Sequence, residues 1–142
     1  MKMKKFSHRF VLKSIGFVVL VVLFLIVGCK ESDLSTGNML QNQWQWVQTS
    51  GGIGGVVLTP TSEGYNQALD FTEDGTYIRY MNNAIAESGS YRIVKKESIL
   101  DHQVYDTVIF EAGIPMSILT LTDHQLILRE EVWDGFTDTY RR

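Results

Sequence analysis

The sequence has 142 residues, of which 44% are hydrophobic and 20% are charged, and it contains one cysteine, which excludes an intrachain disulfide. Five of the 13 basic residues precede position 29 and all 16 acidic residues follow it, so residues 29–142 carry a net charge of −8. This acidity disfavours partners such as nucleic acids and anionic lipid headgroups, and solubility is its simplest explanation.

The N-terminus combines a basic head with a short apolar run. Residues 1–14 contain no acid, and an unbroken apolar stretch, Ile15–Val27, leads to Gly28. This pattern is typical of a secretory signal peptide. A helix over residues 15–28 would be about 21 Å long, against a bilayer core of about 30 Å. An uncleaved membrane helix is the alternative, and it would have to accommodate Lys13.

The end of the apolar run, Ile26-Val27-Gly28-Cys29, resembles the lipobox of bacterial lipoproteins. In that family the cysteine thiol receives a diacylglycerol, and signal peptidase II cuts just before it. The resemblance implies that residues 1–28 are a signal peptide and that Cys29 is the acylated first residue, which anchors the chain to a membrane. Lys30 stands where many inner-membrane lipoproteins have aspartate, which implies the outer membrane. The segment Glu31-Ser32-Asp33 resembles acidic tethers of surface-exported lipoproteins, so both the periplasmic face and the cell surface stay open.

A polar stretch separates this anchor from the rest of the chain. Residues 30–43 are rich in Ser, Thr, Gly, Asn and Gln. Together with Cys29 they predict a flexible tether over residues 29–43, followed by one domain over residues 44–142.

The domain shows short alternating segments and no sustained helical periodicity, which predicts about eight strands. Turn signals such as Asp74-Gly75, Asn82-Asn83 and Asp134-Gly135 separate them. We expect the long segment 84–94 to be one strand kinked at Gly89. The other expected strands are Trp44–Gln48, Leu69–Phe71, Thr76–Tyr80, Val104–Phe110, Ser117–Thr122, Gln125–Glu130 and Thr137–Arg141. The sequence leaves open whether Val56–Leu58, closed by Pro60, is a further short strand.

Alternation of apolar and polar residues gives a sheet one apolar face, which must be covered. A sheet that closes on itself covers this face and removes its edges. The fold expected is therefore all-β, a small antiparallel up-and-down barrel of eight strands; a two-sheet β-sandwich is the alternative.

Several motifs, in this order and spacing, resemble small bacterial lipocalin-like lipoproteins. They are Trp44-x-Trp46, Gly51-Gly52-x-Gly54, Thr59-Pro60, Leu69-x-Phe71-x-x-Asp74-Gly75-Thr76-Tyr77, Gly89-Ser90-Tyr91, Leu119-x-Leu121 and Asp134-Gly135-Phe136 to Tyr140-x-Arg142. True lipocalins carry Gly-x-Trp on the first strand, and a late arginine packs across that tryptophan. The glycine is missing here, since residue 42 is asparagine. The resemblance implies a barrel closed by Trp44 with Arg141 or Arg142.

Period-two spacing assigns an inner face of the barrel. The pairs Leu69 with Phe71, Tyr91 with Ile93, Leu119 with Leu121, and Leu126 with Leu128 are expected inside. They form either a packed core or the wall of a ligand lumen. The candidate lumen residues are Leu69, Phe71, Tyr77, Arg79, Tyr91 and Leu121.

Arg79 follows Tyr77 on the inward side if the alternation holds, and an inward arginine needs a partner. A ligand carboxylate or phosphate, an internal acid, or water at the barrel rim would each serve. Ile78 with Tyr80 is the alternative inner pair.

The sequence shows no site for catalysis, for a metal or for a cofactor. His102 and His124 share no ligand spacing, and phosphate loops, zinc motifs and serine elbows are missing. The sequence thus predicts a non-enzymatic envelope lipoprotein that binds a small apolar or amphipathic ligand inside its barrel. The alternative is a filled barrel that acts as a protein-binding or structural accessory of the envelope, with contacts on its loops and at Trp133.

Overall fold

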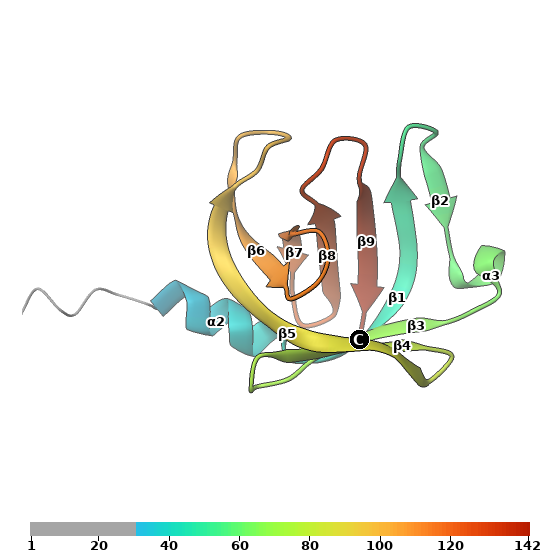
Figure 1. Ribbon diagram of the computed structural model, residues 1–142, viewed down its shortest axis with the longest axis horizontal. Coiled ribbons are helices and arrows are strands. Elements are labelled where there is room, and N and C mark those ends of the chain that lie inside the picture. The colour runs from blue at the N-terminus through green and yellow to red at the C-terminus, as the bar shows by residue number, and fades with distance from the viewer. Residues whose placement is uncertain (1–30) are drawn as a thin grey trace, which may run out of the picture. The chain divides into compact units, whose positions relative to one another are not determined.

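The computed structural model describes residues 31–142, and the predicted signal peptide, with Cys29, lies outside the described residues (Figure 1). Nine strands and two short helices make up this part of the chain. The helices are α2 (Glu31–Leu40) and α3 (Pro60–Glu63). The strands are β1 (Asn42–Gly51), β2 (Val56–Leu58), β3 (Gln67–Phe71), β4 (Thr76–Met81), β5 (Ala84–Glu97), β6 (Val104–Phe110), β7 (Met116–Leu121), β8 (Gln125–Glu130) and β9 (Phe136–Arg141).

The strands form one closed antiparallel barrel. From β3 to β9 each strand pairs with the next, and β1 pairs with both β3 and β9, which closes the sheet (Figure 1). Strand β2 pairs only with the end of β1 and stands outside the ring of eight. The prediction of an eight-stranded up-and-down barrel is confirmed, and the β-sandwich alternative was wrong.

The tight turns form at the residues that allow them. Gly75 has a φ of 80°, and Asn82 and Asn83 have φ values of 50° and 66°, a region that glycine and asparagine tolerate best. In the β3–β4 turn, the backbone N–H of Thr72 donates to the carbonyl of Thr76 at 2.9 Å. These turns fix the register of the hairpins, and with it the face to which each side chain points.

Three β-bulges interrupt the alternation on which the inner face was predicted. They lie between Trp46 and Gln48 in β1, opposite Arg79 and Tyr80 in the β4–β5 ladder, and between Ile118 and Thr120 in β7. A bulge adds one residue and shifts the side chains beyond it to the other face. Ile118 is therefore a core residue and Leu119 is not, so the prediction for Leu119 was wrong.

The predicted tether is partly ordered structure. Residues 31–40 form α2, and β1 begins at Asn42, so a flexible link over residues 29–43 was wrong for these residues. Leu40, at the end of α2, is fully buried, and the Thr36 hydroxyl donates to Asp106 Oδ2 at 2.6 Å. The helix has few apolar residues, and its contacts with the barrel account for its order better than its composition.

Alternate connections of an antiparallel barrel emerge at the same end. We call the end that carries residues 52–66, 82–83, 111–115 and 131–135 the open end. The opposite end carries α2 and the turns at residues 72–75 and 122–124, and we call it the closed end. The core fills the barrel between them. Its buried members are Leu40, Trp44, Trp46, Leu69, Phe71, Tyr77, Val108, Phe110, Met116, Ile118, Leu126, Leu128 and Tyr140.

Candidate functional site

The closed end is sealed by a tryptophan between a helix and an arginine. Trp44 is fully buried, and its indole N–H donates to the carbonyl of Leu40 at 2.8 Å. The guanidinium carbon of Arg142 lies 4.4 Å from the centre of the Trp44 ring, within range of a cation–π interaction. Arg142 also donates to the carbonyls of Asp123, at 2.6 Å, and Gln41, at 2.9 Å. Arg141 is exposed and takes no part in this seal.

The interior next to this seal is filled with side chains. Leu69, Phe71 and Tyr77 are each 1% exposed. The Phe71 ring lies 4.9 Å from Tyr91 and 6.2 Å from Phe110, and Phe110 lies 4.8 Å from Tyr77. The Phe71–Tyr91 and Tyr77–Phe110 pairs pack edge to face and the Phe71–Phe110 pair is stacked, so these rings fill the interior here. Leu69, Phe71, Tyr77, Tyr91 and Leu121 thus belong to the packed core or lie against it, and they do not line the cavity described next.

A cavity of about 260 Å³ opens between the strands at the open end. Among the candidate lumen residues, Arg79 alone lines it. Phe110 and Met116, both in the core, contribute apolar surface, and three carboxylates contribute charge. The complete lining is Arg79, Glu87, Phe110, Ala112, Gly113, Ile114, Met116, Glu130 and Asp138.

Arg79 and Glu87 face each other across the β4–β5 ladder. Arg79 Nε lies 3.7 Å from Glu87 Oε2, and Glu87 Oε1 accepts a hydrogen bond from the Tyr77 hydroxyl at 2.6 Å. Arg79 Nε is buried and has no hydrogen-bond partner in the described part of the chain. Burial, followed by the bond to Glu87, raises the pKa of Tyr77 to about 12. The tyrosine thus stays a neutral donor at physiological pH.

Asp138 is held on the opposite side by two hydroxyl groups. Its Oδ1 accepts from Thr49 and its Oδ2 from Tyr140, at 3.3 Å. Thr49 in turn accepts from the indole N–H of Trp46 at 2.9 Å. Burial and the neighbouring Asp138 charge raise the pKa of Tyr140 far above its ordinary value. This series of hydrogen bonds fixes the carboxylate of Asp138 at the cavity wall.

Glu130 ties the β8–β9 loop to the cavity. Its Oε2 accepts from the backbone N–H of Phe136 at 2.9 Å, and its side chain packs against Gly135, where an added Cβ would meet Glu130 Cβ at 3.0 Å. The loop is also joined to its neighbours by backbone bonds, from Glu131 to Pro115 at 2.9 Å and from Gly52 to Gly135 at 3.3 Å. Three of the open-end loops therefore support one another around the cavity.

Large apolar side chains are exposed on the loops and strand ends at this end. Ile53 is 90% exposed and Trp133 is 72% exposed, and their loops meet at the Gly52–Gly135 bond. Ile114, in the third of these loops, lines the cavity and is 40% exposed. Exposed apolar side chains near a cavity are typical of binding surfaces.

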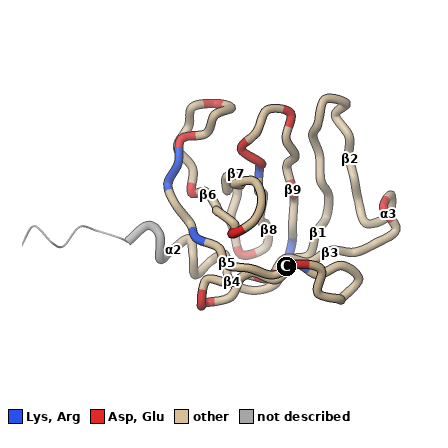
Figure 2. The backbone as a smooth tube through the Cα atoms, in the orientation of Figure 1, with Lys and Arg blue, Asp and Glu red and all other residues tan. Residues whose placement is uncertain are grey.

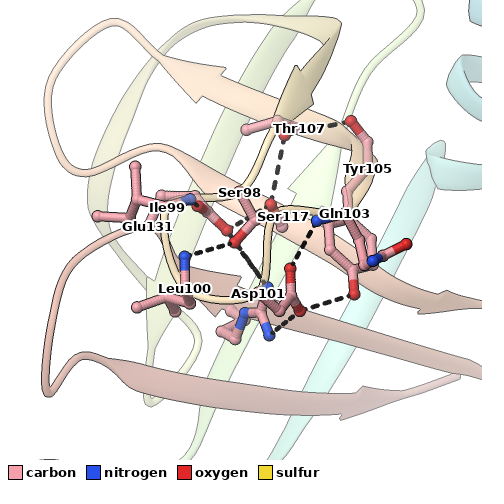
Figure 3. A network of polar contacts seen from close by, with 10 residues as sticks. Ser98, Ile99, Leu100, Asp101, Gln103, Tyr105, Thr107, Ser117 and Glu131 are labelled. Atoms are coloured by element: carbon pink, nitrogen blue, oxygen red, sulfur yellow. Dashed lines mark hydrogen bonds and ion pairs between the residues drawn. The ribbon is translucent and has the colours of Figure 1, made fainter.

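A second polar cluster lies outside the barrel, where the turn between β5 and β6 folds onto β7 and β8 (Figure 3). Glu131 is 6% exposed and accepts hydrogen bonds from the Ser117 hydroxyl at 2.6 Å and from the Ile99 backbone at 3.1 Å. Arg129 pairs with Asp101 at 3.0 Å, and this bond lowers the pKa of Asp101 to about 2. Of the buried side-chain donors and acceptors in this cluster, only Arg129 Nε lacks a hydrogen bond within the described residues, and the other bonds fasten the turn to the barrel wall.

Apart from Arg79, the polar residues of the cavity were missed by the sequence analysis, although a signal for each of them exists. Glu130 follows Leu126 and Leu128 at period two, and Asp138 precedes Tyr140 in the same way, so both continue an inward series. Glu87 also continues an inward series, that of Tyr91 and Ile93, whereas Thr49, which holds Asp138, lies beyond a bulge, where alternation gives no guidance.

The two histidines of the domain and the predicted lipidation site lie outside the cavity or outside the described residues. His102 and His124 are exposed turn residues, and no group of metal-ligating side chains occurs within residues 31–142. In the same range no helix has the length and apolar character needed to cross a membrane. The lipidation predicted at Cys29 concerns a residue that the structure does not describe.

The fold and its closed end define a class of protein: an eight-stranded antiparallel barrel compatible with a lipocalin-like fold. Comparison with known proteins adds no family, since no family model, curated protein or solved structure matches the chain. The arguments for function therefore rest on the geometry of the open end.

Proposed function

We propose that this chain is a lipocalin-like lipoprotein of the bacterial cell envelope that binds a small amphipathic ligand at the open end of its barrel, without catalysis. The observation that carries the proposal is the cavity of about 260 Å³, with Phe110 and Met116 on its wall beside charged groups. Ligand sites combine apolar walls with a few placed polar groups. Sites for drug-sized ligands span about 300–1,000 Å³, so the ligand proposed here is small.

The lining favours an amphipathic ligand over a purely apolar one. Arg79, Glu87, Glu130 and Asp138 all reach the cavity, and an apolar molecule would bury them without hydrogen bonds. The apolar residues first expected to hold a ligand are packed against one another instead. In this proposal these residues form the packed core beneath the cavity and keep its wall rigid.

The anchoring part of the proposal rests on the lipobox resemblance at Cys29, with the outer membrane as the expected location, on its periplasmic face or at the surface. Cys29→Ser should yield an unprocessed precursor without a lipid label, when cells are fed a radiolabelled fatty acid. Normal labelling of this variant would contradict the anchor.

Native mass spectrometry of the full chain, extracted in detergent from an envelope-bearing host, tests the binding part. We expect a discrete added mass that organic solvent removes. Ala112→Trp fills the cavity from an exposed position and should abolish the added mass, whereas Ala84→Trp, exposed on the β4–β5 turn, should retain it. A bare protein mass in the unmodified chain, after exposure to an envelope extract, would contradict ligand binding.

A second candidate function is a protein-binding accessory of the envelope. It is favoured by Ile53 and Trp133, which are 90% and 72% exposed on adjoining loops. Exposed tryptophans are frequent anchors of protein interfaces. A defined envelope partner that is retained by the unmodified chain and lost on Trp133→Ala would support this function, while a ligand in the cavity would favour the first.

A further inference from the structure

The charges that line the open-end cavity do not balance. Three carboxylates, from Glu87, Glu130 and Asp138, face one guanidinium, from Arg79. Both oxygens of Asp138 accept protein hydroxyl groups, whereas Glu130 uses Oε2 for the Phe136 backbone and has no recorded bond at Oε1 within residues 36–142. A cationic group in the cavity would compensate this excess of negative charge.

The guanidinium of Arg79, in contrast, requires an anionic hydrogen-bond acceptor. Its one recorded partner in the described chain is Glu87 at 3.7 Å, and its buried Nε makes no hydrogen bond. A guanidinium carries five N–H donors in a fixed plane, and a carboxylate is the acceptor that matches this geometry. The terminal Nη1 and Nη2 groups also make no hydrogen bond to residues 36–142, and since the Arg79 side chain is 34% exposed they remain for an acceptor from outside.

We propose that the cavity binds a zwitterion of amino-acid size, with its ammonium group toward Glu130 and Asp138 and its carboxylate on Arg79. A simple anion would meet three carboxylates, and a simple cation would leave Arg79 without a hydrogen-bond acceptor. Phe110 and Met116 supply apolar surface for the side chain of the ligand. This inference rests on the proposed function, because it names the ligand class of the same cavity.

The proposed zwitterion site can be tested with three probes, two of which each lack one of the two charges. They are leucine, N-acetylleucine, which lacks the cation, and leucine amide, which lacks the anion. Isothermal titration calorimetry on the full chain in detergent should show leucine binding at least roughly tenfold more tightly than either derivative, since a site built for a polar group rejects the analogue without it.

Two variants assign the two ends of the ligand. Arg79→Gln should remove the preference for leucine over leucine amide, because the partner of the carboxylate is gone. Glu130→Gln should remove the preference for leucine over N-acetylleucine, because the partner of the ammonium group is gone. The amide oxygen of the substituted side chain can still accept the hydrogen bond from the Phe136 backbone. Lys96→Gln and Glu73→Gln make the same changes of charge at exposed positions outside the cavity lining and should bind as the unmodified chain does. Near-UV circular dichroism checks that each variant is folded.

The outcomes separate this inference from the proposed function. Equal affinity for leucine and either derivative would overturn the zwitterion. Failure of all three probes together with a different molecule in native mass spectrometry would overturn it too, while the proposed function would stand. Failure of the probes together with a bare protein mass would overturn both.

Discussion

The two ends of the barrel use the same strands for opposite purposes. At the closed end the inward residues are apolar, and Trp44 is fully buried beneath Leu40 and Arg142. At the open end the same strands continue with Thr49, Arg79, Glu87, Glu130 and Asp138, and the interior becomes polar and partly empty. Figure 2 marks the positions of the acidic and basic residues along the backbone. The difference indicates that stability is concentrated at one end, which leaves the other end free to carry charges that contribute little to folding.

The largest expected effect is at the seal. Trp44→Ala removes a fully buried ring, the bond to Leu40 and the surface on which Arg142 lies. We expect a loss of about 3–5 kcal/mol in the free energy of unfolding, measured by urea denaturation. Trp133→Ala, at an exposed position, should change it by less than about 0.5 kcal/mol. Similar losses at the two tryptophans would contradict the contrast between the ends.

Arg142→Ala should have the next largest effect, because the seal loses a cation–π contact and two hydrogen bonds to backbone carbonyls. We expect a loss of about 1–3 kcal/mol by the same measurement. The neighbouring Arg141→Ala, which alters an exposed side chain, is the matched control and should be close to neutral. A larger loss for Arg141 would show that the wrong arginine has been assigned to the seal.

Tyr77 belongs to the packed core and also bonds to Glu87 of the cavity lining, and its raised pKa makes the free energy of unfolding depend on pH. Its pKa is raised from 10.0 to about 12 in the folded protein, so the unfolded chain loses this proton first as the pH rises. Stability contributed by Tyr77 is therefore complete below pH 10 and is lost between pH 10 and about 12. Tyr77→Phe should weaken this loss and cost about 1 kcal/mol at neutral pH through the missing bond to Glu87. Unfolding curves for both proteins across this pH range provide the check, and identical slopes would contradict the assignment.

Glu130→Gln should have the smallest effect on folding. The amide preserves the acceptor for the Phe136 backbone and removes one of three carboxylates around the cavity. We expect a change of less than about 0.5 kcal/mol in the free energy of unfolding, of either sign. A loss comparable to that of Arg142→Ala would show that the open end also contributes strongly to stability.

The sequence predicted the barrel well because its signals are local. Asp74-Gly75 and Asn82-Asn83 form the turns expected of them, and Leu69, Phe71, Leu126 and Leu128 are buried as their spacing indicates. Bulges are not visible in a period-two pattern, which explains why Leu119 was placed inside in place of Ile118.

The candidate site was harder to predict, for physical reasons. The cavity depends on where core packing stops along each strand, and side-chain volumes from eight strands decide that point together. Arg79 was found because an inward charge in an apolar alternation is conspicuous. Glu87 was not, although it shares the inward face of Tyr91 and Ile93, because glutamate side chains are usually exposed. Helix α2 was missed since its order comes from contacts such as that of Thr36 with Asp106.

The pairing of β1 with β9 has a consequence for how the chain reaches this structure. Trp46 pairs with Tyr140, so the contact that closes the ring joins the two ends of the domain in sequence. Contacts between residues so far apart are slow to form, because a large loop must be ordered first. During synthesis, β1 and β3 to β8 can assemble only as an open sheet with two free edges until β9 is available. Such edges readily pair with other chains, so the interval before β9 arrives is when this protein is most exposed to aggregation.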